Sequence, residues 1–287
     1  MMTIKEALDD ARKQLSEAAY GEAGEARLLL ARVMGISKEE TLRDEEKTLT
    51  ADQQKNFEIV LTRRCEGMPV ARITGMKEFW GLSFYLNEHT LVPRPDSECV
   101  VACAVKRLQE CQAKGTSEPR LLDLGTGSGC LLLSVLSECR NVSGVGVDCV
   151  TGALGQAADN ARALGLLTRA HFQLSQWYQQ LNQNMLFHVI LANPPYISRD
   201  DYEDLSVEVK DHDPIMALVG GERGDEPYEE IVQGAPQFLA SGGWLIVEIS
   251  WEKGIVVSEI FEAAGFDHIS VGQDLGGRDR YVMGRKG

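Results

Sequence analysis

The sequence predicts an α/β protein in which a mainly parallel sheet with intervening helices follows a small helical domain. From residue 120 onward, short apolar segments of strand character alternate with segments of helical character. This alternation is typical of a parallel sheet. Before residue 76, the chain instead shows helical periodicity and helix-capping patterns. Two domains of different class are therefore expected in one chain.

Helical signals fill residues 1–75. Three stretches match the capping-box pattern, in which Ser or Thr is followed three residues later by Glu or Gln, and they begin at Thr3, Ser37 and Thr50. Helices are predicted after Thr3, over residues 22–34 and over residues 50–65, each with apolar residues on one face. Because this region contains no catalytic constellation, residues 1–75 are expected to dock the substrate.

Residues 76–92 are aromatic and β-rich, and they predict a hairpin that links the two domains. The next stretch, Pro93–Glu98, should open a helix, because acidic residues are favoured in a first helical turn. The catalytic domain is expected over residues 93–287.

The expected strands and helices of that domain alternate along the chain. The strands are predicted at residues 120–124, 142–147, 170–174, 187–192 and 243–249, with a closing pair near 268–271 and 280–283. The helices are predicted at about residues 130–137, 152–164, 226–239 and 251–264.

Composition excludes several classes of function. A net charge of −14 argues against nucleic acid as the main partner, because neutralising phosphates requires clustered Lys and Arg. No apolar run is long enough for a membrane span, and the first residues lack the apolar core of a signal peptide. The seven cysteines never form a C-x-x-C pair. These features predict a cytoplasmic protein.

Asn193-Pro194-Pro195-Tyr196 follows the apolar segment 187–192 and carries the strongest chemical signal. Two prolines stop both helix and strand, so the stretch is stiff and exposes an Asn amide, proline carbonyls and an aromatic face. The Asn193 side-chain oxygen and the Pro194 carbonyl can each accept one hydrogen of a planar NH2 group. Tyr196 could lie against the plane of that group.

A glycine-rich turn lies between the predicted strand 120–124 and its helix. It comprises Gly125, Thr126, Gly127, Ser128 and Gly129, and glycines there let the backbone approach a ligand closely. Asp148 stands 23 positions after Gly125, where an acidic residue can bind a ribose diol. The glycines alternate singly rather than as G-x-G-x-x-G, and no Walker lysine follows, which excludes a P-loop.

These two motifs resemble those of class I S-adenosylmethionine-dependent methyltransferases. The Asp-x-Gly-x-Gly-x-Gly form is similar to their cofactor loop, and Asn-Pro-Pro-Tyr is similar to their N-methyltransferase motif. The resemblance implies a Rossmann-like catalytic domain with a mainly parallel seven-stranded sheet. Ligands bind at the carboxyl ends of such strands, where both motifs lie.

Further stretches resemble the HemK/PrmC family over nearly the whole chain. They are Pro69–Gly75, Glu78–Gly81, Val92–Glu98, Asn193–Ile197, Asp213–Leu218 and Gly221–Gly224. By this resemblance Gly125 to Gly129, Asp148 and Asn193 hold S-adenosyl-L-methionine, and Trp177 lies against its adenine. Asn193, Pro194, Pro195 and Tyr196 hold the substrate glutamine, with Asn193, Pro194 and Tyr196 acting in catalysis. Gln176 departs from the Asp of many relatives, and Ser97 from the more usual Thr.

The resemblance implies methylation of the N5 amide nitrogen of the Gly-Gly-Gln glutamine in class I peptide-chain release factors. S-adenosyl-L-homocysteine would be the second product, and neither a metal nor a general base is expected. Two alternatives in the same fold are a glutamine methyltransferase of a ribosomal protein and an N-methyltransferase acting on a nucleic-acid base amine. A third, a cofactor-binding adaptor without chemistry, conflicts with the intact Asn193–Tyr196 motif.

Overall fold

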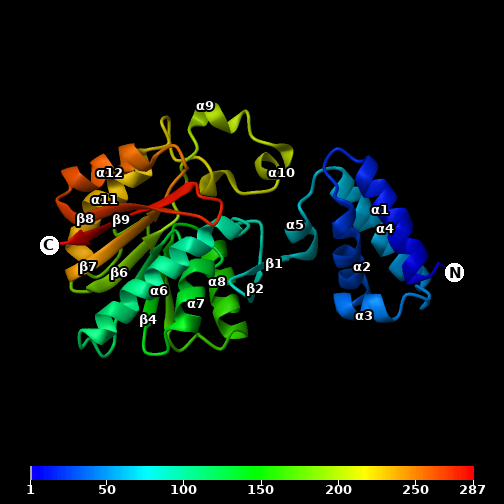
Figure 1. Cartoon of the computed structure of the whole chain (residues 1–287), viewed down its shortest axis with the longest axis horizontal. Coiled ribbons are helices and arrows are strands. Elements are labelled where there is room, and N and C mark those ends of the chain that lie inside the picture. The colour runs from blue at the N-terminus through cyan, green and yellow to red at the C-terminus, as the bar shows by residue number, and fades with distance from the viewer. Residues whose placement is uncertain (1) are drawn as a thin grey trace. The chain divides into compact units, whose positions relative to one another are not determined.

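The computed structural model in Figure 1 describes residues 2–287, which divide into two compact units. The smaller unit holds the residues up to Met76 together with Ser206–His212. The larger unit holds Lys77–Leu205 and Asp213–Gly287. The chain therefore leaves the larger unit once, for seven residues, and then returns to it, a feature that the sequence analysis does not predict.

The smaller unit is helical, as predicted. Its elements are α1 (Ile4–Glu17), η1 (Ala23–Glu25), α2 (Ala26–Met34), α3 (Lys38–Arg43), α4 (Ala51–Cys65), α5 (Val70–Thr74) and, from the returning segment, α10 (Val207–Lys210). All three predicted capping boxes form, at the starts of α1, α3 and α4. The apolar faces of α1, α2 and α4 bury one common core, which includes Leu8, Leu30 and Phe57.

Arg64 ties the returning segment into this unit. Its guanidinium is buried, with Nε 2.7 Å from Glu25 Oε2 and Nη1 2.7 Å from Glu208 Oε1. A buried guanidinium is stable only when it is paired, so α4 requires the carboxylates of both η1 and α10.

The predicted hairpin forms with a shorter extent than residues 76–92. Strands β1 (Met76–Phe79) and β2 (Leu82–Tyr85) flank a turn in which Trp80 and Gly81 both have positive φ. Phe79 and Phe84 are buried and pack edge to face. Leu91 and Val92 lie outside any strand.

The larger unit is built on a seven-stranded sheet with the order β5-β4-β3-β6-β7-β9-β8. Its strands are β3 (Arg120–Leu124), β4 (Ser143–Asp148), β5 (Ala170–Leu174), β6 (Phe187–Ala192), β7 (Leu239–Glu248), β8 (Phe266–Gln273) and β9 (Asp279–Lys286). The first five in the order are parallel, and β9 pairs antiparallel with both β7 and β8. The predicted mainly parallel sheet and its closing pair are confirmed.

Helices cover both faces of this sheet (Figure 1). One face carries α6 (Glu98–Ala113), α7 (Cys130–Glu138) and α8 (Thr151–Ala163), and the other carries α11 (Glu226–Phe238) and α12 (Gly254–Ala263). Helix α12 begins three residues later than expected, because Ser250 to Lys253 form a hydrogen-bonded turn. Short elements η2 (Pro95–Ser97), α9 (Arg199–Tyr202) and η3 (Ile215–Ala217) lie in the connections. None of the helices in residues 2–287 is both long and apolar enough to span a membrane.

Candidate active site

The strand register aligns the ends of four neighbouring strands. Leu124 of β3 pairs with Val147 of β4 and with Ala192 of β6, and Ala192 pairs in turn with Val247 of β7. The residues that follow these four positions are Gly125, Asp148, Asn193 and Glu248. They form one row across the carboxyl edge of the sheet, where α/β proteins bind their ligands.

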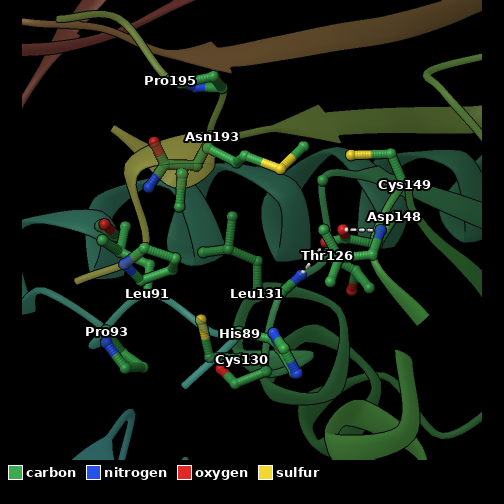
Figure 2. A pocket seen from close by; sticks show the side chains of 18 of the residues that line it. His89, Leu91, Pro93, Thr126, Cys130, Leu131, Asp148, Cys149, Asn193 and Pro195 are labelled. Carbon is green, nitrogen blue, oxygen red and sulfur yellow. Dashed lines mark hydrogen bonds between the residues drawn. The ribbon is translucent and has the colours of Figure 1, made fainter. Parts of the chain in front are cut away.

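A cavity of about 570 Å³ opens over this row (Figure 2). Figure 2 shows Asp148 and Thr126 at one end of the cavity and Asn193 and Pro195 at the other. The lining residues from the two predicted motifs are Gly125, Thr126, Gly127, Ser128, Asp148, Asn193 and Pro195, and Trp177 also lines it. The structure thus brings most of the predicted site residues together in one cavity.

The glycine loop needs its glycines. Gly125, Gly127 and Gly129 all have φ between +54° and +81°, a region in which other residues are strained. The loop is also anchored from beneath, because the Thr126 hydroxyl donates to Asp123 Oδ2 over 2.7 Å. Gly129 does not line the cavity, and a Cβ at this position would crowd Leu133 and Ala157 instead.

Asp148 is held in place by backbone donors. Its Oδ2 accepts from Gly127 N over 2.9 Å and its Oδ1 accepts from Val150 N over 2.9 Å. Burial raises the pKa of this carboxyl, and the backbone hydrogen bonds oppose that shift. Each carboxylate oxygen keeps a second lone pair, so Asp148 can still accept hydrogen bonds from hydroxyls in the cavity.

Trp177 stands in a strained turn after β5, with φ of +45°. The Ser175 hydroxyl stabilises that turn, because it donates to the Trp177 carbonyl over 2.9 Å and accepts from Gln180 N over 3.2 Å. The indole lies beside Gly125, where a side chain would meet its ring. Gln176, the departure from the usual Asp, also lines the cavity.

The Asn193–Tyr196 motif divides between the cavity and the core. Asn193 and Pro195 line the cavity, whereas Pro194 is buried and Tyr196 packs, half-buried, against the core under α11. Ile197 N donates to Leu218 O, and Gly220 N donates to Ile197 O. These two bonds fix residues 218–220 against the end of the motif. The substrate roles assigned to Pro194 and Tyr196 stay predictions.

A salt bridge joins the two segments that cover the cavity. Arg94 Nη2 lies 2.8 Å from Oδ2 of the buried Asp213, and Val92 N donates to Asp213 Oδ1. Pro93 and Arg94 line the cavity from one segment, and residues 214–217 line it from the other. Ile215 and Met216 are mostly exposed at its mouth and present an apolar rim.

Sequence reasoning missed several of these residues. His89 and Cys149 line the cavity but belong to no motif, and Ser97 lines it although the family-like stretch Val92–Glu98 is assigned no role in the site by the sequence. Glu248 offered a weak signal, since it is a charged residue at the end of the apolar run 244–249.

Comparisons with known proteins agree with this architecture. Residues 6–75 match the family model of the PrmC N-terminal domain, and residues 104–209 match that of the methyltransferase small domain. The release factor glutamine methyltransferase of Agrobacterium fabrum (strain C58) is 39% identical over 285 residues, which cover 99% of this chain and 98% of that protein. The chain belongs to the release factor glutamine methyltransferase family.

The same family includes a relative from Escherichia coli (strain K12) that is 34% identical over 97% of both chains. Among solved structures, the catalytic domain of hMettl16 in complex with an RNA hairpin has a TM-score of 0.59 at 13% identity. It covers 79% of this chain and 81% of that chain, and at this identity it shows the fold alone. The protein is a methyltransferase of the class I, Rossmann-like fold with a helical N-terminal region.

The buried Asp123 beneath the glycine loop should make stability depend on pH. Burial raises the pKa of its carboxyl to about 7, although the Thr126 hydroxyl opposes the shift. The folded protein then binds this proton more tightly than the unfolded chain, whose Asp titrates near about 3.9. Asp123 therefore stabilises the fold at low pH, and that contribution is lost as pH rises towards 7.

Between pH 5 and 7.5 the free energy of unfolding of the parent protein should fall by on the order of 2 kcal/mol because of Asp123, and Asp123→Asn should remove this decrease. Urea unfolding curves recorded at several pH values measure it. Glu226→Gln is the matched control, because backbone hydrogen bonds lower the pKa of Glu226 to about 2 and its contribution changes only below pH 5. The prediction is wrong if the free energy of unfolding depends on pH in the same way in Asp123→Asn and in the parent protein.

Proposed function

We propose that this enzyme methylates the N5 amide nitrogen of the Gly-Gly-Gln glutamine in class I peptide-chain release factors, with S-adenosyl-L-methionine as the methyl donor. One observation carries the proposal: the glycine loop with Asp148 and the Asn193 end of the second motif open into one cavity. The names and full-length similarity of the relatives support the choice of substrate.

The residues present fit S-adenosyl-L-methionine. The cavity volume of about 570 Å³ lies in the range of small-molecule sites. Gly125 and Gly127 allow close approach of the backbone, Asp148 accepts from the ribose hydroxyls, and Trp177 provides an apolar face for the adenine. When bound, this group would supply an electrophilic methyl on a sulfonium and leave as S-adenosyl-L-homocysteine, and the methylated amide nitrogen would release one proton to water.

The Asn193 end of the cavity would hold the glutamine. An amide nitrogen is a poor nucleophile, because its lone pair is delocalised into the carbonyl. Asn193 Oδ1 and the Pro194 carbonyl accept the two amide hydrogens, which orients the nitrogen and favours its pyramidal form. The predicted role of Tyr196 is to lie against the plane of this amide, although in the structure it packs against the core beside the cavity. Positioning and preorganised electrostatics thus supply the rate enhancement.

Selection of the protein substrate requires contacts away from the reacting amide, since glutamine occurs in almost every protein. We assign this docking role to the helical domain of residues 1–75, which has none of the cavity-lining groups. Residues 76–92 then link it to the catalytic domain of residues 93–287. The net charge of −14 disfavours a nucleic-acid substrate. The seven unpaired cysteines suit the reducing cytoplasm, where release factors act.

Asn193→Ala should abolish methyl transfer, because it removes an acceptor for the substrate amide while the glycine loop and Asp148 remain. Mass spectrometry of release factors after incubation with enzyme and S-adenosyl-L-methionine measures the methyl on the Gly-Gly-Gln glutamine. Cofactor affinity, measured by calorimetry, should stay within about threefold of the parent value. If the parent enzyme leaves the Gly-Gly-Gln glutamine of the release factor unmethylated, the proposed function is wrong. Single-turnover activity near the parent level would remove Asn193 from the site.

Asp148→Ala should have the opposite effect, weakening the cofactor more than the glutamine. Losing a charged acceptor for the ribose hydroxyls should cost roughly 1.5–3 kcal/mol, or about 10- to 150-fold in affinity. Asp148 also accepts from Gly127 N, so Asp148→Asn, which retains an acceptor oxygen, serves as the control for loop collapse. Unchanged cofactor binding in the Ala variant would exclude Asp148 from the ribose site.

Removal of the docking domain should lower kcat/KM on a whole release factor steeply and change activity on a short Gly-Gly-Gln peptide little. Because Ser206–His212 belongs to the helical unit, a chain that starts at Met76 must also carry a glycine–serine replacement of that segment. The same replacement in the full-length protein is the control, and retained cofactor binding shows that the sheet is folded. Full activity of the shortened chain on the whole release factor would rule out docking by residues 1–75.

A further inference from the structure

Glu248 is the fourth member of the row at the carboxyl edge, and the mechanism above does not use it. It follows Val247 of β7, whose partner Ala192 precedes Asn193, so the two side chains leave adjacent strands at the same level. Glu248 is only 2% exposed, and its Oε2 has no hydrogen-bond partner within residues 2–287. Burying a carboxyl with an unsatisfied oxygen costs free energy, so packing alone does not explain a glutamate at this position.

Two side chains of the cavity contact this carboxyl. Burial, the largest effect, raises the pKa of Glu248 to about 7, and the polar side chains of Ser97 and Asn193 close to this carboxyl lower it. The charge on Arg280 of β9 also lowers the pKa of Glu248, although Arg280 is already paired with Asp96 over 3.2 Å and with Asp274 over 3.1 Å.

The charge on Asp96 of η2 also raises the pKa of Glu248, and the remaining groups around this carboxyl are neutral acids. Tyr196 and Tyr228 face it from the motif and from α11, and burial and the charge on Glu248 both raise the pKa of these phenols. Cys99 and Cys130 face it from α6 and α7, and burial is the main reason that their pKa values rise to about 12. Of the groups near Glu248, the carboxyl itself is thus the one that titrates close to neutral pH.

We infer that Glu248 is a positioning residue that fixes the orientation of the Asn193 amide for methyl transfer. An Asn side chain has one accepting oxygen and one donating NH2 group, and the two flipped orientations have nearly the same shape. An ionised carboxylate can only accept, so Asn193 must turn Nδ2 towards Glu248. Oδ1 then faces the cavity, where the glutamine amide needs an acceptor. This inference rests on the proposed function.

Protonation of Glu248 would remove the preference for one orientation of the Asn193 amide. A neutral carboxylic acid can donate its proton to Asn193 Oδ1 and so accommodate the flipped amide, which turns Nδ2 towards the substrate NH2 group. Two donors would then face each other. The kcat for methyl transfer should therefore rise with pH through about 7, the pKa of Glu248, and level off above it.

Glu248→Gln in the full-length enzyme tests the inference. The kcat of the variant at pH 8 should fall about 10- to 100-fold, because the Asn193 amide that contacts the substrate is no longer held in one orientation. Its cofactor affinity should stay within about threefold of the parent value. Its kcat should also lose the rise through pH 7. Glu98→Gln is the control, since Glu98 accepts from Trp80 N over 2.9 Å and does not line the cavity. A merely structural role would lower the thermal stability of Glu248→Gln and leave its kcat and pH profile at parent values, which would overturn the inference.

A second measurement is independent of activity and of the substrate. In protein with 15N-labelled asparagine, the Asn193 side-chain NH2 signals, assigned with Asn193→Ala, should shift with an inflection near pH 7. That inflection should vanish in Glu248→Gln and persist in Glu98→Gln. Its absence in the parent protein would overturn the inference even if release factors are methylated, and its presence would support the inference even if they are not.

Discussion

The structure depends on the parallel register of β4, β3, β6 and β7. Because Leu124, Val147, Ala192 and Val247 pair across these strands, the next residue of each emerges on the same edge. Four positions that lie far apart in the sequence thereby become neighbours, because the hydrogen-bonded strands place them side by side. Apolar packing on both faces of the sheet maintains this register, so the site is a consequence of the core.

Local patterns predicted most of the fold, because the physics that decides those elements is local. The capping boxes at Thr3, Ser37 and Thr50 form as expected, since each needs only residues within one helical turn. The glycine loop was likewise predictable, because its positive φ values restrict the residue type at each position. The late start of α12 escaped prediction, since Trp251 fits a helical pattern and only the turn bond from Lys253 N to Ser250 O excludes it.

The contacts between distant segments that sequence reasoning missed are non-local. Arg94 and Asp213 are 119 positions apart, and nothing in either stretch identifies the other as its partner. Glu208 pairs with Arg64 across a similar separation, so the return of residues 206–212 to the helical unit has no signature in the chain. Pro194 and Tyr196 show the converse problem. The motif predicts chemistry for all four residues, yet packing in three dimensions determines which of them line the cavity.

The path of the chain connects the helical unit to residues on both sides of the cavity, which the motifs alone do not show. After Tyr196 the chain runs through α9 into Ser206–His212 of the helical unit, and it re-enters the larger unit at Asp213, which anchors one wall of the cavity. In the proposed docking role, a protein bound to the helical unit would act on a segment that residues 197–205 connect to the Asn193–Tyr196 motif and that continues directly into residues 213–217. A reaction that relies on positioning benefits from such a connection, because binding energy obtained away from the amide can be used to order the residues around it.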